Sequence, residues 1–158
     1  MPYVAGHTGH EGCVFCRMVA HPAQRDAETY ILHRGRHVFA VLNLYPYNNG
    51  HLMVLPYDHV ASLEQLSPQT QTDLMHLVCH FVDVIRRAMA PAGFNVGVNL
   101  GRAAGAGIDD HVHVHVVPRW LGDTNFMPVI AETRVIPELL DDTYKKLRAL
   151  IGQYPPPC

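Results

Sequence analysis

The run from His111 to Val117, in which histidine and valine alternate, constrains the fold of this chain more than any other segment. Side chains of a strand point to its two faces in turn, so a strand here places three imidazoles on one face and valines on the other. The valines suit a core and the imidazoles suit a cleft. Such a row of imidazoles favours either a metal centre or phosphoryl and nucleotidyl transfer with one ring as the nucleophile.

The glycine-rich stretch 101–108 lies directly before this segment, and Arg102 is its only cation. Glycines let backbone N–H groups close around an anion, so a loop of this kind joined to the histidine run favours a phosphate site over a metal-only site. Asp109 and Asp110 follow at once, where carboxylates are unusual beside an anionic substrate. We expect them to cap the loop or to face solvent rather than to take part in catalysis.

The rest of the chain predicts an α+β fold with an antiparallel sheet of about five strands, one long helix and one C-terminal helix. Ser67 and Pro68 are an N-cap and a first-turn proline for the long helix, which should end before Pro91. The C-terminal helix is expected over 137–151. We expect one domain over 1–158, with a flexible leader at 1–12 and a flexible tail at 152–158. The expected strands are 29–33, 37–43, 51–56, 94–100 and 111–117.

Charge and hydropathy exclude several classes of function. The formal net charge of −2 provides no basic field for a nucleic-acid polymer or an anionic membrane. The apolar runs are far shorter than the roughly 18 residues of a membrane span, and the N-terminus has no signal-peptide pattern. We therefore expect a cytoplasmic protein. Twelve histidines match the whole Lys and Arg count without forming a consecutive run, so a purification tag is excluded.

Several ordered blocks together resemble the histidine triad (HIT) family. The run at 111–117 matches its signature of three alternating histidines, and C-x-x-C at 13–16, Asn43 and the stretch 50–59 match upstream elements. The stretch 118–128 resembles the branch of bacterial diadenosine-tetraphosphate phosphorylases and related hydrolases. One departure is Gly107, which stands where many members carry a glutamine that reaches a bridging phosphate oxygen. The loss of that donor leaves room for phosphate, in place of water, as the acceptor.

The resemblance implies a role for each matching residue. His113 would attack the α-phosphorus and carry the nucleotide, while His115 and His51 would flank the phosphate as hydrogen-bond donors. Trp120 would stack on the base or close a subunit interface, although as the only tryptophan it can also be a core residue. The implied substrate is AMP-containing and the implied assembly is a homodimer. The other implied substrate-binding residues are Asn43 at the ribose, Leu44 and Phe15 at the base, and Asn99, Gly107 and Ile108 at the phosphates.

By itself, the C-x-x-C pair of Cys13 and Cys16 is compatible with a redox role, a metal-binding role or no specific role. The resemblance implies a closed structural zinc site completed by His59 and His111, without an organic cofactor; the alternative is a pair of buried thiols. Cys79 is expected in the core. Alternative functions are a nucleoside phosphoramidate hydrolase, a non-catalytic AMP-binding sensor, and, more remotely, a metal hydrolase that uses the three alternating histidines as ligands.

Overall fold

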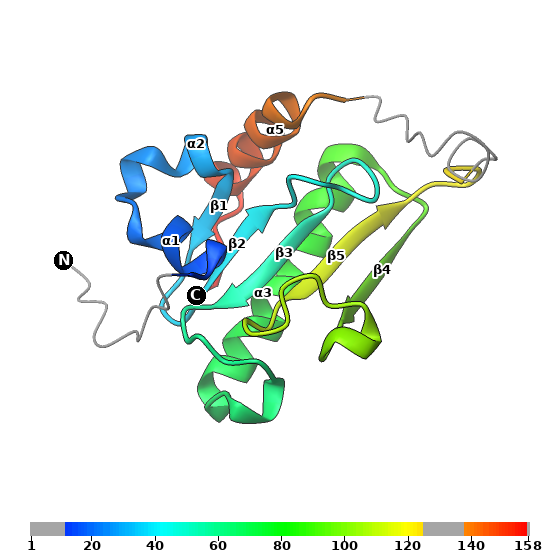
Figure 1. Ribbon diagram of the computed structural model, residues 1–158. Helices are drawn as coiled ribbons and strands as arrows, with labels where there is room; N and C mark the ends of the chain where they lie inside the picture. The colour runs from blue at the N-terminus through cyan, green and yellow to red at the C-terminus, as the bar shows by residue number, and fades with distance from the viewer. Residues whose placement is uncertain (1–11, 125–137, 158) are drawn as a thin grey trace.

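The computed structural model describes residues 12–124 and 138–157, and these form an α+β domain around one antiparallel sheet (Figure 1). Within these residues the sheet has five strands in the order β1-β2-β3-β5-β4. The first three follow one another as a meander, and β5 inserts between β3 and β4, so the order is not fully sequential. The bounds are β1 Ile31–Arg34, β2 Val38–Leu42, β3 Leu52–Pro56, β4 Gly93–Val98 and β5 Val114–Arg119.

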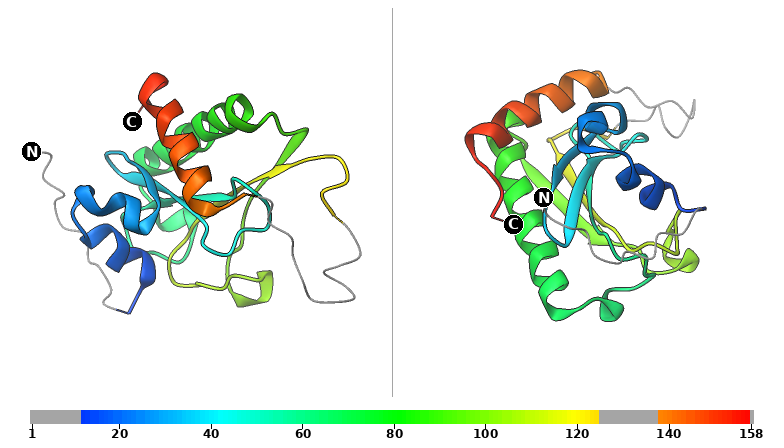
Figure 2. Two further views of the ribbon diagram at one scale, coloured as in Figure 1. Left: turned by 90° about the horizontal axis from the view of Figure 1, so that it is seen from above. Right: turned by 90° about the vertical axis from the view of Figure 1, so that its left-hand side faces the viewer.

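Helices cover both faces of the sheet, as the right-hand view of Figure 2 shows. The long helix α3 (Pro68–Met89) and the C-terminal helix α5 (Leu140–Gln153) lie on one face, and α1 (Val14–Ala20) lies on the other. The short helix α2 (Asp26–Thr29) leads from α1 into β1. The face under α3 and α5 buries the larger apolar cluster, and the face under α1 buries a second one around Phe15 and Phe39. Burial on both faces makes the central strands almost wholly apolar.

The expected limits of the long helix are confirmed by its caps. The Ser67 hydroxyl accepts a hydrogen bond from the Thr70 backbone N–H, and Pro68 occupies the first turn. The C-cap residue Ala90 adopts a left-handed conformation with φ 45°, directly before Pro91. None of the described helices is both long and apolar enough to cross a membrane.

The structure differs from the sequence expectation in the end of the C-terminal helix and in the position of Cys79. Helix α5 continues to Gln153, two residues into the predicted tail, and the Arg87 guanidinium lies 4.6 Å from the centre of the Tyr154 ring. This contact ties the chain after α5 to α3. Cys79 is exposed rather than part of the core, because α3 turns Leu77 and Val78 inward and Cys79 outward.

Candidate functional site

The histidine run enters the sheet later than the sequence indicates. Strand β5 begins at Val114, where the last register pairs with Val54 of β3 and Val98 of β4 lie. The strand pairing does not extend back to Val112, because the Val112 N–H donates to the Val60 carbonyl instead (2.7 Å). On the neighbouring strand Pro56 has no N–H to offer. His111 and His113 therefore precede β5, and only His115 lies within it.

The alternation of faces nevertheless holds through this irregular start. Val112, Val114 and Val116 all belong to the apolar cluster beneath α3. His111 and His113 are buried on the opposite face, with 0% and 6% of their surface exposed, and His115 is half-buried. The predicted separation of valines from imidazoles is thus confirmed. The imidazoles then divide into two groups with different neighbours.

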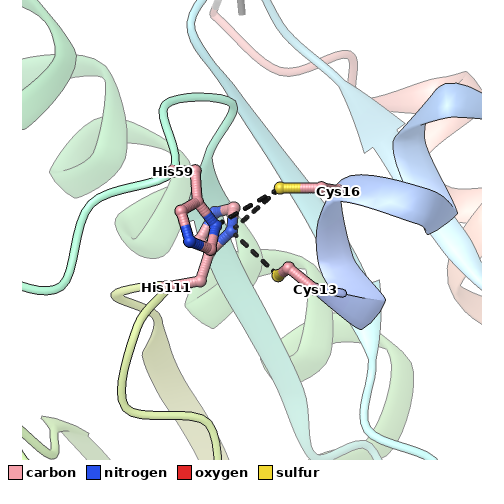
Figure 3. Close-up of side chains that lie close together, drawn as sticks. All are labelled: Cys13, Cys16, His59 and His111. Atoms are coloured by element: carbon pink, nitrogen blue, oxygen red, sulfur yellow. Dashed lines mark hydrogen bonds between the residues drawn. The ribbon is translucent and has the colours of Figure 1, made fainter. Parts of the chain in front are cut away.

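His111 belongs to a group of four potential metal ligands, shown in Figure 3. Cys13 caps the N-terminus of α1, Cys16 lies in its first turn, His59 follows β3, and His111 precedes β5. One ligand atom from each of the four lies within 4.8 Å of all the others. The expected convergence of these residues, distant in sequence, is therefore found in the fold.

The distances within this group fit a tetrahedral ion. The Nδ1 atom of His111 lies 3.5 Å from the Cys13 sulfur and 3.6 Å from the Cys16 sulfur, and His59 Nδ1 lies 3.4 Å from the Cys16 sulfur. A tetrahedral zinc with Zn–S of about 2.3 Å and Zn–N of about 2.1 Å requires S–N separations of about 3.6 Å. These three separations match that geometry, and the other ligand atoms lie within 4.8 Å of one another, so the residues present fit such an ion.

On His111 and on His59, a contact outside the four-ligand group determines which ring nitrogen faces the thiols. The Nε2–H of His111 donates to the Pro56 carbonyl (2.9 Å), and His59 Nε2 lies 3.5 Å from a carboxylate oxygen of Asp110. Contacts of this kind orient metal-binding histidines in proteins. Asp109 forms an ion pair with Arg102 at 2.7 Å. The two carboxylates of the acidic pair therefore have different neighbours, Arg102 for Asp109 and His59 for Asp110.

His113 presents the opposite nitrogen to its surroundings. Its Nδ1 lies 2.8 Å from the backbone carbonyl of His111. A carbonyl oxygen only accepts hydrogen bonds, so Nδ1 carries the proton and the lone pair of the neutral ring lies on Nε2. The Phe15 ring lies 5.4 Å from His113 and helps to bury it. This arrangement leaves a nucleophilic nitrogen next to His115, whose ring centre is 4.8 Å away.

His51 and His115 form a hydrogen-bonded pair next to His113, in which His51 is the donor and His115 the acceptor. The Tyr47 backbone N–H donates to His51 Nδ1 (3.0 Å), so the proton of the neutral His51 ring lies on Nε2. That nitrogen lies 2.9 Å from His115 Nδ1, which must accept, and His115 therefore carries its own proton on Nε2. His51 has no exposed surface. Its Nε2–H is directed at His115, so the expectation that both histidines flank a phosphate stays a prediction.

Burial keeps this pair uncharged. Desolvation, followed by the nearby histidines, lowers the pKa of His51 to about 3 and that of His115 to about 4. Both rings are therefore neutral at pH 7, and His115 offers a neutral N–H donor. Such a donor is preorganised for a developing negative charge.

The residues expected around a nucleotide lie in two loops beside the histidines. Asn43 ends β2, and its side-chain carbonyl accepts from the Tyr45 N–H (3.0 Å), while its amide nitrogen lies 3.4 Å from both His51 ring nitrogens. Leu44 is exposed and lines a cavity of about 220 Å³ with His51 and the start of α5. Asn43 and Leu44 thus lie beside His51, whereas Phe15, the other residue expected at the base, is buried against His111 and His113.

The glycine-rich loop lies on the other side of the histidines. It turns at Gly101 and Gly105, whose φ angles of 80° and 87° favour glycine. Ile108 packs against the apolar cluster under α1, while Gly107 is exposed. Asn99 is half-buried, with its amide nitrogen close to Gly105. The backbone of this loop is therefore anchored at Ile108 and open at Gly107.

Sequence reasoning missed Tyr47 and Asp123. Tyr47 supplies the N–H that orients His51, and its ring stacks on His51 with centres 4.9 Å apart. Asp123 accepts from the side chains of Asn48 and Arg119 and from the backbone N–H of half-buried Trp120, so it joins the β2–β3 loop to the end of β5. No periodicity marks either residue, because both lie in turns and their partners come from distant segments.

Comparisons with known proteins agree with this geometry. The family model described as the HIT domain matches residues 24–120, which is more than half of the chain. An AP-4-A phosphorylase of Mycobacterium tuberculosis is 50% identical over 126 residues, covering 80% of this chain and 65% of that relative, less than two thirds of its length. An adenosine 5'-monophosphoramidase of Schizosaccharomyces pombe is 33% identical over 109 residues, covering 68% of this chain and 74% of that relative.

A solved structure adds the same conclusion for the fold. The crystal structure of a zinc-bound histidine triad family protein from Mycobacterium smegmatis has a TM-score of 0.72 and 27% identity, covering 90% of this chain and 95% of that one. The matched segment contains both ligand histidines, the histidine run and the loops on either side of it. The chain therefore belongs to the histidine triad family.

Proposed function

We propose that this protein is a nucleotide hydrolase or nucleotidyl transferase that cleaves a dinucleoside polyphosphate of the diadenosine tetraphosphate class at its α-phosphate. The observation that carries the proposal is the bond from His113 Nδ1 to the His111 carbonyl, which leaves the Nε2 lone pair beside the N–H donor of His115. The 50% identity to an AP-4-A phosphorylase supports the choice of substrate.

In the first step, His113 Nε2 attacks the α-phosphorus and the bond to the bridging oxygen breaks. The nucleotide is then held by a P–N bond, and the leaving polyphosphate takes the electron pair. A polyphosphate leaves as an anion, so a hydrogen bond from the neutral His115 Nε2–H suffices to stabilise it. Backbone N–H groups near Gly107 and Ile108, with Asn99, would hold the non-bridging oxygens.

In the second step, water or inorganic phosphate attacks the same phosphorus and the P–N bond breaks, which restores His113. Water yields AMP and phosphate yields ADP. The exposed Gly107 offers no side-chain donor to orient a water, which favours phosphate as the acceptor. Asn43 and Leu44 would hold the ribose and the base of the transferred nucleotide, and Trp120 lies at the adjoining end of β5.

We propose zinc as the ion of the four-ligand group. Two thiolates and two imidazoles at tetrahedral spacing are a donor set typical of structural zinc, and burial raises the pKa of the Cys13 thiol unless a cation stabilises the thiolate. When bound, the ion supplies a rigid crosslink and no chemistry. Cys13 and Cys16 would fasten α1 to the sheet, and His111 would fix the backbone carbonyl that orients His113.

A phosphoramidate hydrolase is the second candidate, favoured by the 33% identity to an adenosine 5'-monophosphoramidase. It would use the same His113 and differ only in its leaving group. A non-catalytic AMP-binding sensor has no observation of its own in its favour. The homodimer and the cytoplasmic location stay predictions from the family resemblance and the sequence.

The test is incubation of the purified protein with diadenosine tetraphosphate, with and without inorganic phosphate. We expect ATP with ADP when phosphate is present, and little or no product without it. ATP with AMP in both samples would identify a hydrolase. Turnover of adenosine phosphoramidate but not of the dinucleotide would replace the first candidate with the second, and tight AMP binding without turnover of either would support the sensor.

A further inference from the structure

Asp123, in the turn that follows β5, accepts hydrogen bonds from two separate segments of the chain. Within its own turn it accepts from Arg119 Nε (2.6 Å), from Arg119 Nη2 (2.7 Å) and from the Trp120 backbone N–H (3.1 Å). From the β2–β3 loop it accepts from the side-chain amide of Asn48 (2.8 Å), 75 residues away in the sequence. The bonds from Arg119 lower the pKa of Asp123 to about 2, so its side chain is a carboxylate at pH 7.

Asn48 uses both its side chain and its backbone to fix the β2–β3 loop. Its amide nitrogen also donates to the Pro118 carbonyl (3.2 Å), and its amide oxygen accepts from the Asn49 backbone N–H (3.1 Å). Its backbone carbonyl accepts from the His51 backbone N–H (3.1 Å). The two protons of the amide therefore go to β5 and to the turn after it, which ties this part of the loop to the end of β5.

The loop held in this way supplies the contact that sets the donor direction in the His51–His115 pair. The Tyr47 backbone N–H, one residue before Asn48, donates to His51 Nδ1 (3.0 Å). While that bond exists, the His51 proton lies on Nε2 and His115 accepts it at Nδ1. Without it the neutral rings can exchange roles, so that His115 Nδ1–H donates to His51 Nε2. His115 then presents a lone pair on its own Nε2 in place of a donor.

We infer that Asp123 is a positioning residue that acts through Asn48 and the Tyr47 backbone to keep the proton of His115 on Nε2. Its effect on the reaction rests on the proposed function, in which the leaving polyphosphate needs that N–H. The alternative is that Asp123 only closes the turn after β5. The two roles predict different results for Asn48→Ala, which leaves the ion pair of Asp123 with Arg119 in place.

The first test reads the position of the proton directly. Two-bond nitrogen–proton NMR spectra of the histidine rings at pH 7 distinguish Nδ1–H from Nε2–H, and His115→Gln assigns the His115 signals. We expect Nε2–H at His115 in the wild type, and a larger share of Nδ1–H in Asp123→Asn and in Asn48→Ala. Asn95→Ala is the matched control, because it removes only the contact of Arg119 Nη1 with Asn95 (2.7 Å) and should keep the wild-type form.

The second test measures turnover of diadenosine tetraphosphate. Asp123→Asn and Asn48→Ala should each lower kcat by about 10-fold, because a misdirected donor no longer stabilises the leaving group, whereas KM should change by less than about 2-fold. The double variant should lose little more than either single variant, since both substitutions break the same chain of contacts. Asn95→Ala should keep the wild-type kcat.

Four results would overturn the inference. An unchanged His115 tautomer in folded Asn48→Ala or Asp123→Asn protein would mean that Asp123 only closes its turn. Losses of kcat that add up in the double variant would mean that the two residues act separately. A raised KM with unchanged kcat would assign the loop to substrate binding alone. Wild-type protein with Nδ1–H at His115 would contradict the inference even if neither variant folds.

The ring spectra also separate this inference from the proposed function, because they require no substrate. Absence of turnover by the wild type, together with the expected change of the His115 tautomer in the variants, would refute the proposed reaction and support the positioning role of Asp123. Turnover by the wild type with an unchanged tautomer in the variants would support the reaction and refute that role.

Discussion

His111 and His113 lie on one face, two residues apart, yet they offer different nitrogens to their surroundings. The His111 ring gives its Nε2–H to the Pro56 carbonyl and turns Nδ1 to the thiols. The His113 ring gives its Nδ1–H to the His111 carbonyl and keeps Nε2 for the site. The difference teaches that the position of a carbonyl, rather than the residue type or the strand face, decides which nitrogen an imidazole offers, as the proposed ligand and nucleophile roles require.

His113→Ala is the variant that most clearly separates the role of His113 from that of the four-ligand group around His111. We expect turnover to fall by about 10³-fold or more, because the proposed P–N bond to this ring can no longer form. Metal content by elemental analysis should stay at the wild-type level, near one zinc per chain. Retention of normal turnover would show that His113 is not the nucleophile.

His59→Ala tests the four-ligand group around His111. Loss of one of four ligands should empty the metal site and lower the free energy of unfolding by about 3 kcal/mol, which corresponds to roughly 6–12 °C in Tm for a domain of this size. His76→Ala, on the exposed side of α3, is the matched control and should change neither quantity. Wild-type protein that carries no metal as purified, or a variant with the Tm of metal-containing wild type, would contradict the zinc proposal.

The neutral pair His51 and His115 predicts a dependence of stability on pH. Their pKa values of about 3 and about 4 in the folded protein lie below the ordinary histidine value of about 6.5 in the unfolded chain. The unfolded chain therefore binds more protons as the pH falls from about 6.5 to 4, so stability present at pH 7 is lost across that range. Urea unfolding at pH 7, 5.5 and 4.5 measures the loss.

His51→Gln is the variant that assigns this loss. It should flatten the pH dependence in the same range, and it should lower turnover at pH 7 by about 100-fold because His115 loses its orienting partner. A variant with an unchanged pH profile would show that other groups, such as the metal ligands, dominate the linkage.

The smallest expected effect comes from Asp110, which contacts His59 and is not itself one of the four potential ligands. Asp110→Asn removes the carboxylate charge 3.5 Å from His59 Nε2 and should weaken metal affinity by about 10-fold, as outer contacts of ligand histidines usually do. Asp109→Asn is the control, because Asp109 pairs with Arg102 instead. Competition with a chromogenic chelator measures both. An equal effect of the two substitutions would indicate a general charge effect rather than a specific contact.

Local signals predicted the strands, the caps of α3 and the two faces of the histidine run, because these depend on periodicities within one segment. They failed where a distant segment takes a backbone hydrogen-bond donor that the sheet would otherwise use. The Val112 N–H turns to Val60, so β5 starts at Val114 instead of His111. They also failed for Cys79, which lies between inward-facing neighbours on α3 and points outward. Tyr47 lies in a turn, where no pattern distinguishes a site residue from a loop residue.

The sequence by itself determined that three imidazoles share one face, that a glycine-rich loop precedes them, and that two cysteines form a C-x-x-C pair. The alternation of a strand is a property of neighbouring residues, so no tertiary contact is needed to infer it. Only the tertiary structure decided which nitrogen each histidine presents, that His51 donates to His115, and that Tyr47 orients His51. Those outcomes depend on donors and acceptors from Pro56, His111 and Tyr47, whose positions relative to each ring are set by folding.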